Sequence, residues 1–138
     1  LSECRLKMET LEARVREERP HVAAVIYNRL EKKMPLQLDS TLQYALGKYG
    51  QRLLYEDRTV DSPYNTYKHR GLPPGPISSP GLDALRAALN PSDKPYLYFV
   101  SNADGKTHTF SATEREHLKA VAKFRKEIAP QRKALQEQ

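Results

Sequence analysis

The spacing of apolar residues along the chain predicts mainly helices. Between positions 22 and 30, apolar side chains recur every three to four residues, which is the period of an amphipathic helix. Pro20 suits the first turn of that helix, where a missing N–H costs nothing. Residues 7–19 contain no Gly or Pro and favour an earlier helix, and residues 82–89 predict a short one that ends before a proline.

A short extended segment and a further helix are predicted after position 33. Pro35 keeps its predecessor out of the helical region, so residues 34–38 are expected to be extended. Asp39 and Ser40 then offer N-caps for a helix that Gly47 would end. The N-cap role is one interpretation of Asp39, and a place in a binding site is the other.

Residues 61–80 predict a long loop with a fixed shape. They contain five of the ten prolines, which excludes a helix or a central strand. Apolar and aromatic residues between the prolines distinguish the segment from a flexible polar linker. Proline also restricts the unfolded chain, and ordered loops of this length are often functional.

The C-terminal third predicts a β-hairpin followed by a helix. Residues 96–100 and 107–110 are strand-like and flank turn-forming residues. Ser111 and Glu114 have the spacing of a capping box, and Pro130 would end or kink the helix that follows. These elements together predict one α+β domain over residues 1–138, mainly helical, with a β-hairpin and a long ordered Pro-rich loop.

Composition excludes several classes of protein. The 138 residues have no stretch long and apolar enough to span a bilayer, and the single cysteine, Cys4, excludes an internal disulfide. His69, His108 and His117 are spaced too irregularly for a zinc motif, and glycine-rich phosphate loops are absent. We therefore expect no metal ion and no cofactor.

The net charge of +6 favours an anionic partner, which includes nucleic acid, anionic lipid and cell-wall polymer. Both signs alternate along the helical stretches, as on an ordinary solvated surface. Charge alone therefore does not choose between these partners. A nucleic-acid-binding domain would leave the Tyr-Asn-Thr-Tyr loop at 64–67 unexplained, and we expect no nucleic-acid partner.

Glu9 and Glu12 are the candidate general acids. They lie three residues apart and share one face of the predicted first helix. Apolar neighbours of Glu12 would raise its pKa and suit it to proton donation. The alternative is that both are solvent-facing charges of an ordinary helix.

Several stretches resemble the endolytic murein transglycosylase (YceG-like) family, in the order in which that family has them. They are VAAVIYNRL (22–30), MPLQLDST (34–41), YALG (44–47), SPYNTY (62–67), GLPPGPI (71–77), PG (80–81), YFV (98–100), HTF (108–110) and His117. The resemblance extends from about Glu12 to His117.

This resemblance implies a peptidoglycan-cleaving enzyme whose catalytic part lies outside the cytoplasmic membrane. It also implies an upstream membrane helix and a LysM-like module, which would place this chain in the catalytic half. The family's acid/base glutamate precedes the Val-Ala-x-Val helix in a Glu-x-Glu motif. Counting back without a gap places it at Glu12, with Thr10 where the first Glu stands. If a gap is allowed, Glu9 competes for the position.

The implied reaction breaks the β-1,4 bond between N-acetylmuramic acid and N-acetylglucosamine and leaves a 1,6-anhydro ring. We expect Glu12 to be the catalytic acid and base. The expected sugar-binding residues are Asn28, Gln37, Asp39, Thr41, Tyr64, Asn65, Thr66, Tyr67 and His108. The expected partners are glycan strands of peptidoglycan and cell-wall synthesis enzymes. The rival hypothesis is an inactive module that binds glycan and has lost the acid.

Overall fold

A computed structural model describes residues 16–48, 51–79 and 81–137. In these ranges the chain is α+β and mainly helical, as the sequence predicted. The elements in order are η2 (Arg16–Glu18), α2 (Arg19–Glu31), α3 (Asp39–Leu46), η3 (Tyr55–Thr59), α4 (Leu82–Leu89), β1 (Tyr98–Ser101), β2 (His108–Ser111) and α5 (Glu114–Gln136). No helix among these residues is long and apolar enough to cross a membrane.

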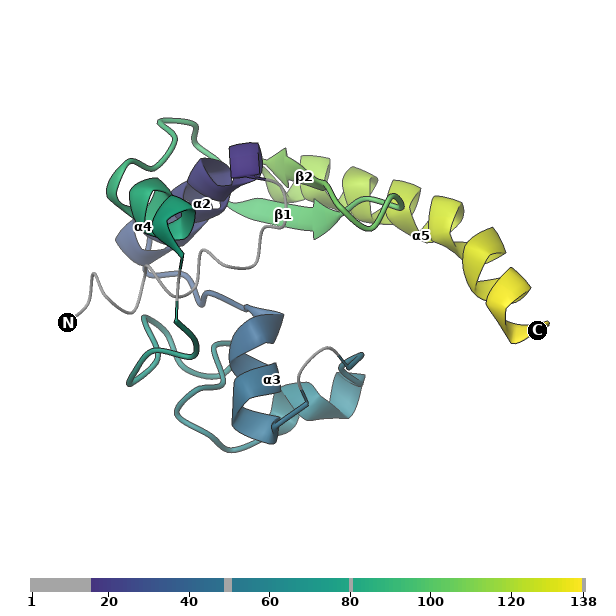
Figure 1. Cartoon of the computed structure of the whole chain (residues 1–138), viewed down its shortest axis with the longest axis horizontal. Coiled ribbons are helices and arrows are strands. Elements are labelled where there is room, and N and C mark those ends of the chain that lie inside the picture. Colours follow the sequence, from purple (N-terminus) through teal and green to yellow (C-terminus); the bar gives the residue numbers. More distant parts are fainter. Residues whose placement is uncertain (1–15, 49–50, 80, 138) are drawn as a thin grey trace.

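The elements form two lobes (Figure 1). The upper lobe comprises α2, α4, the β1–β2 hairpin and α5, and the lower lobe comprises α3, η3 and the loop 60–79. Strands β1 and β2 pair antiparallel, with Phe99 opposite Phe110. Helix α5 packs against the hairpin at its start and then extends beyond the rest of the molecule.

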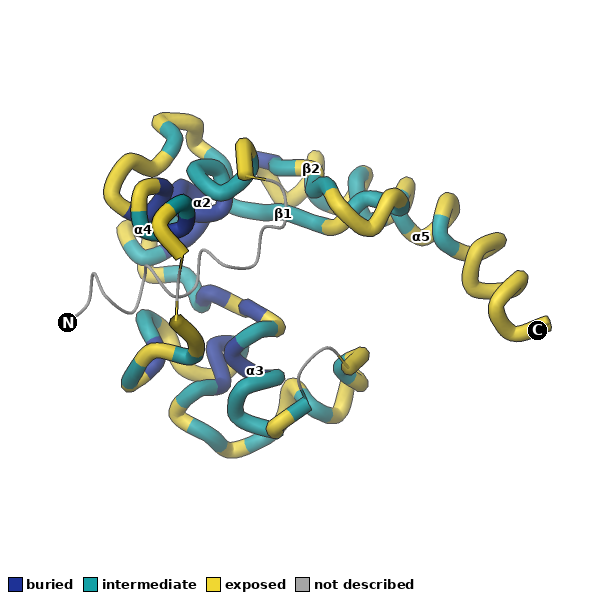
Figure 2. The backbone as a smooth tube through the Cα atoms, in the orientation of Figure 1, coloured by how far each residue is buried: buried dark blue, intermediate teal, exposed yellow. Residues whose placement is uncertain are grey.

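Helix α2 is the centre of the upper lobe. Its residues 22–26 are all buried, which happens only when neighbours cover every side of a helix (Figure 2). Helix α4 buries three alanines, whose small side chains allow it to approach α2 closely. The hydroxyl of Tyr27 donates to the carbonyl of Ala88 at 2.9 Å and fixes this helix pair.

The lower lobe is organised around Thr66, which is buried in the proline-rich loop. Its hydroxyl accepts from the backbone N–H of Leu38 at 2.8 Å and lies 2.9 Å from the hydroxyl of Thr41. Leu36, Leu38 and the α2 core belong to one apolar cluster. The loop is therefore pinned to the start of α3, and α3 is joined to the upper lobe through the segment 34–38.

Two predicted helix caps are wrong. Leu38, not Asp39 or Ser40, is the N-cap of α3, and Asp39 is the first residue inside the helix. Ser111 lies in strand β2, and the cap of α5 is Thr113, whose hydroxyl accepts from the N–H of Glu116. The hairpin extends further along the chain than the sequence suggested, and pairing continues through Ser111.

Other local predictions are confirmed. Pro20 occupies the first turn of α2, and Gly47 ends α3 in the left-handed conformation, with φ 66°. Pro130 does not end α5, which continues to Gln136 and bends over its last turns (Figure 1). The segment 34–38 has no regular helix, but Gln37 interrupts its extended course with a positive φ of 53°.

Candidate active site

A cleft of about 510 Å³ lies between the two lobes. Its lining combines charged, aromatic and amide side chains with aliphatic ones. The polar and aromatic members are Arg29, Gln37, Asp39, Arg58, Tyr67, Tyr98, Phe99, Ser101, His108, Glu114, His117 and Phe124. They come from α2, the lower lobe, the hairpin and α5, so the cleft exists only in the folded chain.

The lower wall of the cleft is an aromatic and acidic group. The hydroxyl of Tyr67 donates to Oδ1 of Asp39 at 2.5 Å. The guanidinium of Arg58 lies 4.8 Å from the centre of the Tyr67 ring, within cation–π range. Gln37 adds an exposed amide beside them. A carboxylate, an amide and an aromatic face are the groups that sugar hydroxyls and ring faces bind.

The conformation of Gln37 is unusual for a residue other than glycine. Its positive φ costs free energy of about 1 kcal/mol, and such residues concentrate at functional sites. The N–H of Gln37 donates to the carbonyl of Thr66 at 3.2 Å, so the proline-rich loop holds the turn. This turn allows Gln37 and Asp39 to face the same cleft.

Arg29 lies at the base of the cleft and joins three segments. Its Nε donates to the carbonyl of Leu97 at 2.6 Å, and its Nη1 donates to the carbonyls of Pro35 at 2.7 Å and Leu36 at 3.4 Å. Only 7% of the residue is exposed. This burial lowers the pKa of Arg29, because it removes water from the charged guanidinium.

His108 is held at the hairpin side of the cleft by Glu18. Both carboxylate oxygens of Glu18 accept the backbone N–H of His108, at 2.9 and 2.8 Å. Nδ1 of the imidazole lies 3.5 Å from the same carboxylate, which is close for an ion pair but outside good hydrogen-bond geometry. The carboxylate therefore anchors the start of α2 to β2 and places a negative charge beside the imidazole.

His117 closes the cleft from α5. Its ring stacks on Tyr98, with the ring centres 4.9 Å apart. Burial lowers the pKa of His117, and the positive charge of Arg29 lowers it further, while Glu114 opposes the shift. The imidazole is therefore neutral at neutral pH and has one nitrogen that donates and one that accepts.

The structure brings together four of the residues expected from the sequence, namely Gln37, Asp39, Tyr67 and His108. The other described ones lie elsewhere and build the scaffold. Asn28 donates both amide hydrogens to the carbonyls of Lys94 and Tyr96, which joins α2 to the segment before β1.

Thr41, Asn65 and Thr66 are buried. Asn65 donates to the carbonyls of Arg58 and Val60, and it accepts from the N–H of Tyr67. The half-buried ring of Tyr64 packs against Tyr44, with centres 4.8 Å apart. These residues shape the loop that carries Tyr67 and do not line the cleft themselves.

Glu9 and Glu12 lie outside the described residues. Sequence reasoning also missed several residues that line the cleft, among them Arg29, Arg58, Tyr98 and Glu114. Arg29 lies within a helix whose period predicted core contacts, and no spacing in the sequence indicated which polar group faced a cleft. Among the described residues, no three His, Cys, Asp or Glu side chains gather as a metal site requires.

Comparison with known proteins places this geometry in a family. The sequence profile of the YceG-like family matches residues 10–123. The chain belongs to the YceG-like family. The match includes α2, the lower lobe, the hairpin and the first part of α5, and hence all of the cleft lining from Val25 to His117.

Curated relatives of this YceG-like chain share a name. A protein of Bacillus subtilis (strain 168) called endolytic murein transglycosylase is 50% identical over 113 residues, which cover 82% of the chain and 31% of the relative. A protein of the same name from Streptococcus pneumoniae serotype 2 is 43% identical over 112 residues, or 77% of the chain and 20% of the relative. The chain thus spans less than a third of the length of either.

A crystal structure of a YceG-like protein from Listeria monocytogenes has the same fold. It superposes with a TM-score of 0.74 at 46% sequence identity, over 86% of this chain and 36% of that one. The predicted resemblance to this family, made from the short stretches alone, is therefore confirmed.

Proposed function

We propose that the chain is the catalytic region of a lytic transglycosylase that cleaves peptidoglycan glycan strands. The observation that carries the proposal is 50% identity to an endolytic murein transglycosylase over 82% of this chain. The cleft supports it, because its walls offer aromatic rings, an amide and a carboxylate to a saccharide.

The proposed reaction needs one proton-transferring carboxyl group, for which we propose Glu12. Its proton passes to the glycosidic oxygen, the bond from that oxygen to the muramoyl C1 breaks, and N-acetylglucosamine leaves. The muramoyl 6-hydroxyl then bonds to C1, and its proton returns to Glu12, so no water is consumed. A hydrolase needs a second carboxylate for the incoming nucleophile. Here the nucleophile is part of the substrate, and its positioning replaces that group.

Asp39 suits a different task from proton donation. The hydroxyl of Tyr67 donates to Oδ1 of this carboxylate and fixes its orientation on the cleft wall. A fixed negative charge on the cleft wall favours the positive charge that develops at C1 as the glycosidic bond breaks. We therefore assign Asp39 to the stabilisation of the oxocarbenium-like transition state, and Gln37 and Tyr67 to substrate binding.

The remaining assignments follow the family resemblance. We propose that this region acts outside the cytoplasmic membrane, where peptidoglycan lies, and is held there by an N-terminal membrane helix. We also propose a LysM-like module upstream and cell-wall synthesis enzymes as partners. The proposed site keeps the four cleft residues Gln37, Asp39, Tyr67 and His108. The other expected residues that the structure describes hold the segments that carry these four in place; they are Asn28, Thr41, Tyr64, Asn65 and Thr66.

Digestion of purified sacculi tests the function. The chain is incubated with sacculi, and the soluble products are examined by mass spectrometry for muramoyl ends that have lost water to form the anhydro ring. Glu12→Gln should abolish these ends while the far-UV circular dichroism is retained, and Glu9→Gln serves as the matched control and should leave them. Anhydro ends from the Glu12 variant would remove the assignment. Binding without anhydro ends from the unaltered chain would instead favour the glycan-binding module.

A further inference from the structure

Three side chains meet in the cleft. Arg29 from α2 places its guanidinium carbon 5.0 Å from the centre of the Tyr98 ring on β1. The ring of His117 from α5 stacks on the same tyrosine. All three line the cleft. We call them the Arg29–Tyr98–His117 cluster.

The cluster has hydrogen-bonding groups to spare. A guanidinium has five N–H donors, and Nε and Nη1 of Arg29 account for three of them through backbone carbonyls. The two on Nη2 have no partner among the described residues. Nδ1 of His117 is buried and also has no hydrogen-bond partner within the described part of the chain. Buried polar groups in folded proteins are normally paired, so Nδ1 of His117 points to a bound group, and the N–H groups of Nη2 are available to the same group.

The charge of the cluster indicates the kind of group. Arg29 is buried, yet none of the ion pairs found among residues 16–48, 51–79 and 81–137 includes it. Carbonyl dipoles compensate a buried cation only in part, and an anion would complete the compensation. The two N–H groups of Nη2 are charged donors, and a charge-assisted hydrogen bond to a carboxylate is stronger than one to a neutral acceptor.

Asp39 and Glu114 line the same cleft and carry the opposite charge. The carboxylate of Asp39 is engaged by Tyr67 in the lower lobe, and Glu114 is exposed at the start of α5. Arg58 adds a second cation on the lower wall of the cleft. At the base of the cleft, Arg29 is therefore the charged group that lacks a carboxylate partner among the described residues.

We propose that the Arg29–Tyr98–His117 cluster binds a carboxylate carried by the muramoyl unit, and so selects which sugar occupies the reacting position. This inference rests on the proposed function. N-acetylmuramic acid differs from N-acetylglucosamine only by its 3-O-lactyl group and the peptide attached to it. Both sugars carry the 6-hydroxyl that closes the anhydro ring, so recognition of the 3-O substituent is what selects the muramoyl C1 for reaction. A site built for a charged substituent rejects the sugar that lacks it, because its buried donors stay unpaired.

Binding of three tetrasaccharides tests the proposal. The affinities are measured by calorimetry on the Glu12→Gln chain, so that the ligand is not cut. The first ligand is an alternating muramoyl glycan with free lactyl carboxylates, the second carries stem peptides, and the third is chitotetraose, which has neither. We expect chitotetraose to bind at least tenfold more weakly. If the first ligand already binds more tightly than chitotetraose, the recognised carboxylate belongs to the lactyl group. If only the second ligand does, it belongs to the peptide.

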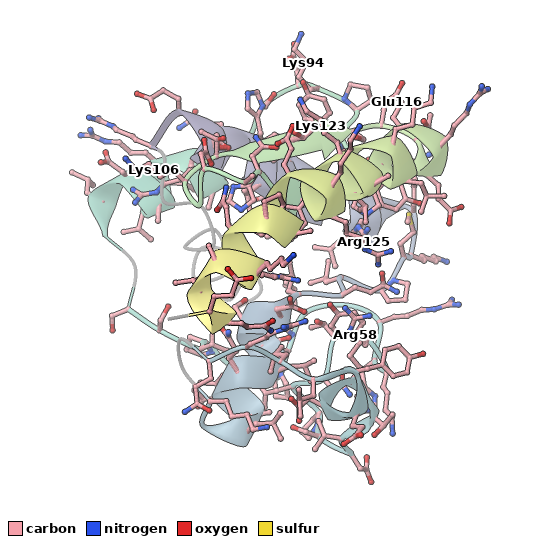
Figure 3. The ribbon with its side chains drawn as sticks, turned by 90° about the vertical axis from the view of Figure 1, so that its right-hand side faces the viewer. Arg58, Lys94, Lys106, Glu116, Lys123 and Arg125 are labelled. Carbon is pink, nitrogen blue, oxygen red and sulfur yellow. The ribbon has the colours of Figure 1, made fainter. Side chains whose placement is uncertain are left out.

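Two conservative variants locate the preference. Tyr98→Phe removes one hydroxyl, and His117→Phe keeps the stacked ring but removes both nitrogens. Each should reduce the preference severalfold, with chitotetraose binding unchanged. Lys94→Ala is the control for the loss of one positive charge, because Lys94 points away from both lobes and does not line the cleft (Figure 3). Arg58 lies on the lower lobe and lines the cleft, so it is not suitable as this control. Arg29→Lys keeps the charge and should lose most of the preference, provided that it folds.

A spectroscopic measurement separates binding from a merely structural role. Burial and Arg29 lower the pKa of His117, and the negative charge of a bound carboxylate would act in the opposite direction. The pKa of His117 should therefore rise when the muramoyl glycan binds but not when chitotetraose binds. Equal affinity for all three ligands, or a preference that both phenylalanine variants retain, would overturn the proposal. Anhydro ends released from sacculi by the unaltered chain would then still support the transglycosylase, so the two failures are distinguishable.

Discussion

Asn65 decides the shape of the lower wall of the cleft, and its replacement is the sharpest test of that scaffold. The residue is fully buried, and its side-chain amide forms three hydrogen bonds with backbone groups. Nδ2 donates to the carbonyls of Arg58 at 3.0 Å and Val60 at 2.8 Å, and Oδ1 accepts from the N–H of Tyr67 at 3.0 Å. Asn65→Ala removes all three bonds and leaves a cavity.

The expected loss of stability follows from these contacts. A hydrogen bond contributes a net ~1 kcal/mol, and a buried partner left unpaired costs about 1–3 kcal/mol. Three bonds to partly buried partners give a loss of roughly 3 kcal/mol for Asn65→Ala. Asn65→Asp keeps the acceptor for Tyr67 but directs a carboxylate oxygen at two carbonyls. We expect it to be at least as destabilising.

Urea unfolding followed by circular dichroism measures both variants, with the free energy of unfolding obtained by linear extrapolation. Asn90→Ala is the matched control, because Asn90 is exposed and its amide makes one bond, to the carbonyl of Arg86 at 3.1 Å. The control should lose less than about 0.5 kcal/mol. A loss for Asn65→Ala no larger than that of the control would refute the scaffold role and return Asn65 to the candidate ligands of the sugar.

Three further variants test other parts of the structure. Glu18→Gln replaces one of the two carboxylate oxygens that accept the N–H of His108 with an amide nitrogen, and should cost about 1 kcal/mol in urea unfolding. Gln37→Gly should stabilise the chain by up to about 1 kcal/mol, because glycine adopts a φ of 53° without strain. Hydrogen bonds from the hydroxyl and N–H of Thr107 and the N–H of Lys106 lower the pKa of Asp104 to about 2. The stability that this carboxylate adds is present above pH 4 and is lost as the pH falls towards 2, and Asp104→Asn should remove that part of the acid dependence.

Two of these variants have a matched control, and the third has a pH dependence that checks it. Glu17→Gln changes an exposed neighbour of Glu18 and should leave stability unchanged. Gln43→Gly lies inside α3 and should destabilise by about 1 kcal/mol, opposite in sign to the change at Gln37. An unaltered slope of stability against pH between 2 and 4 in the Asp104 variant would contradict the assigned pKa.

Patterns of neighbouring residues were enough to predict most helices and the hairpin of this protein. The apolar period of residues 22–30 is a property of neighbouring positions, and it sufficed to predict α2. Gly47 and the cluster of prolines act through the φ angles of single residues, so the end of α3 and the absence of helix from the loop were also predictable. Caps were not. Thr113 caps α5 in place of the nearby Ser111, which pairs in β2, and α3 begins after Leu38, whose side chain cannot cap a helix.

Tertiary structure alone decided which polar residues form the site. Asn65, Thr66 and Tyr67 are adjacent in the sequence, yet the first two are buried and only Tyr67 faces the cleft. Arg29 looked like part of a core helix, and it became a buried cation in the cleft only when β1 and the segment 34–38 packed around it. Burial and pairing depend on contacts between residues far apart in the chain, and no local spacing records them.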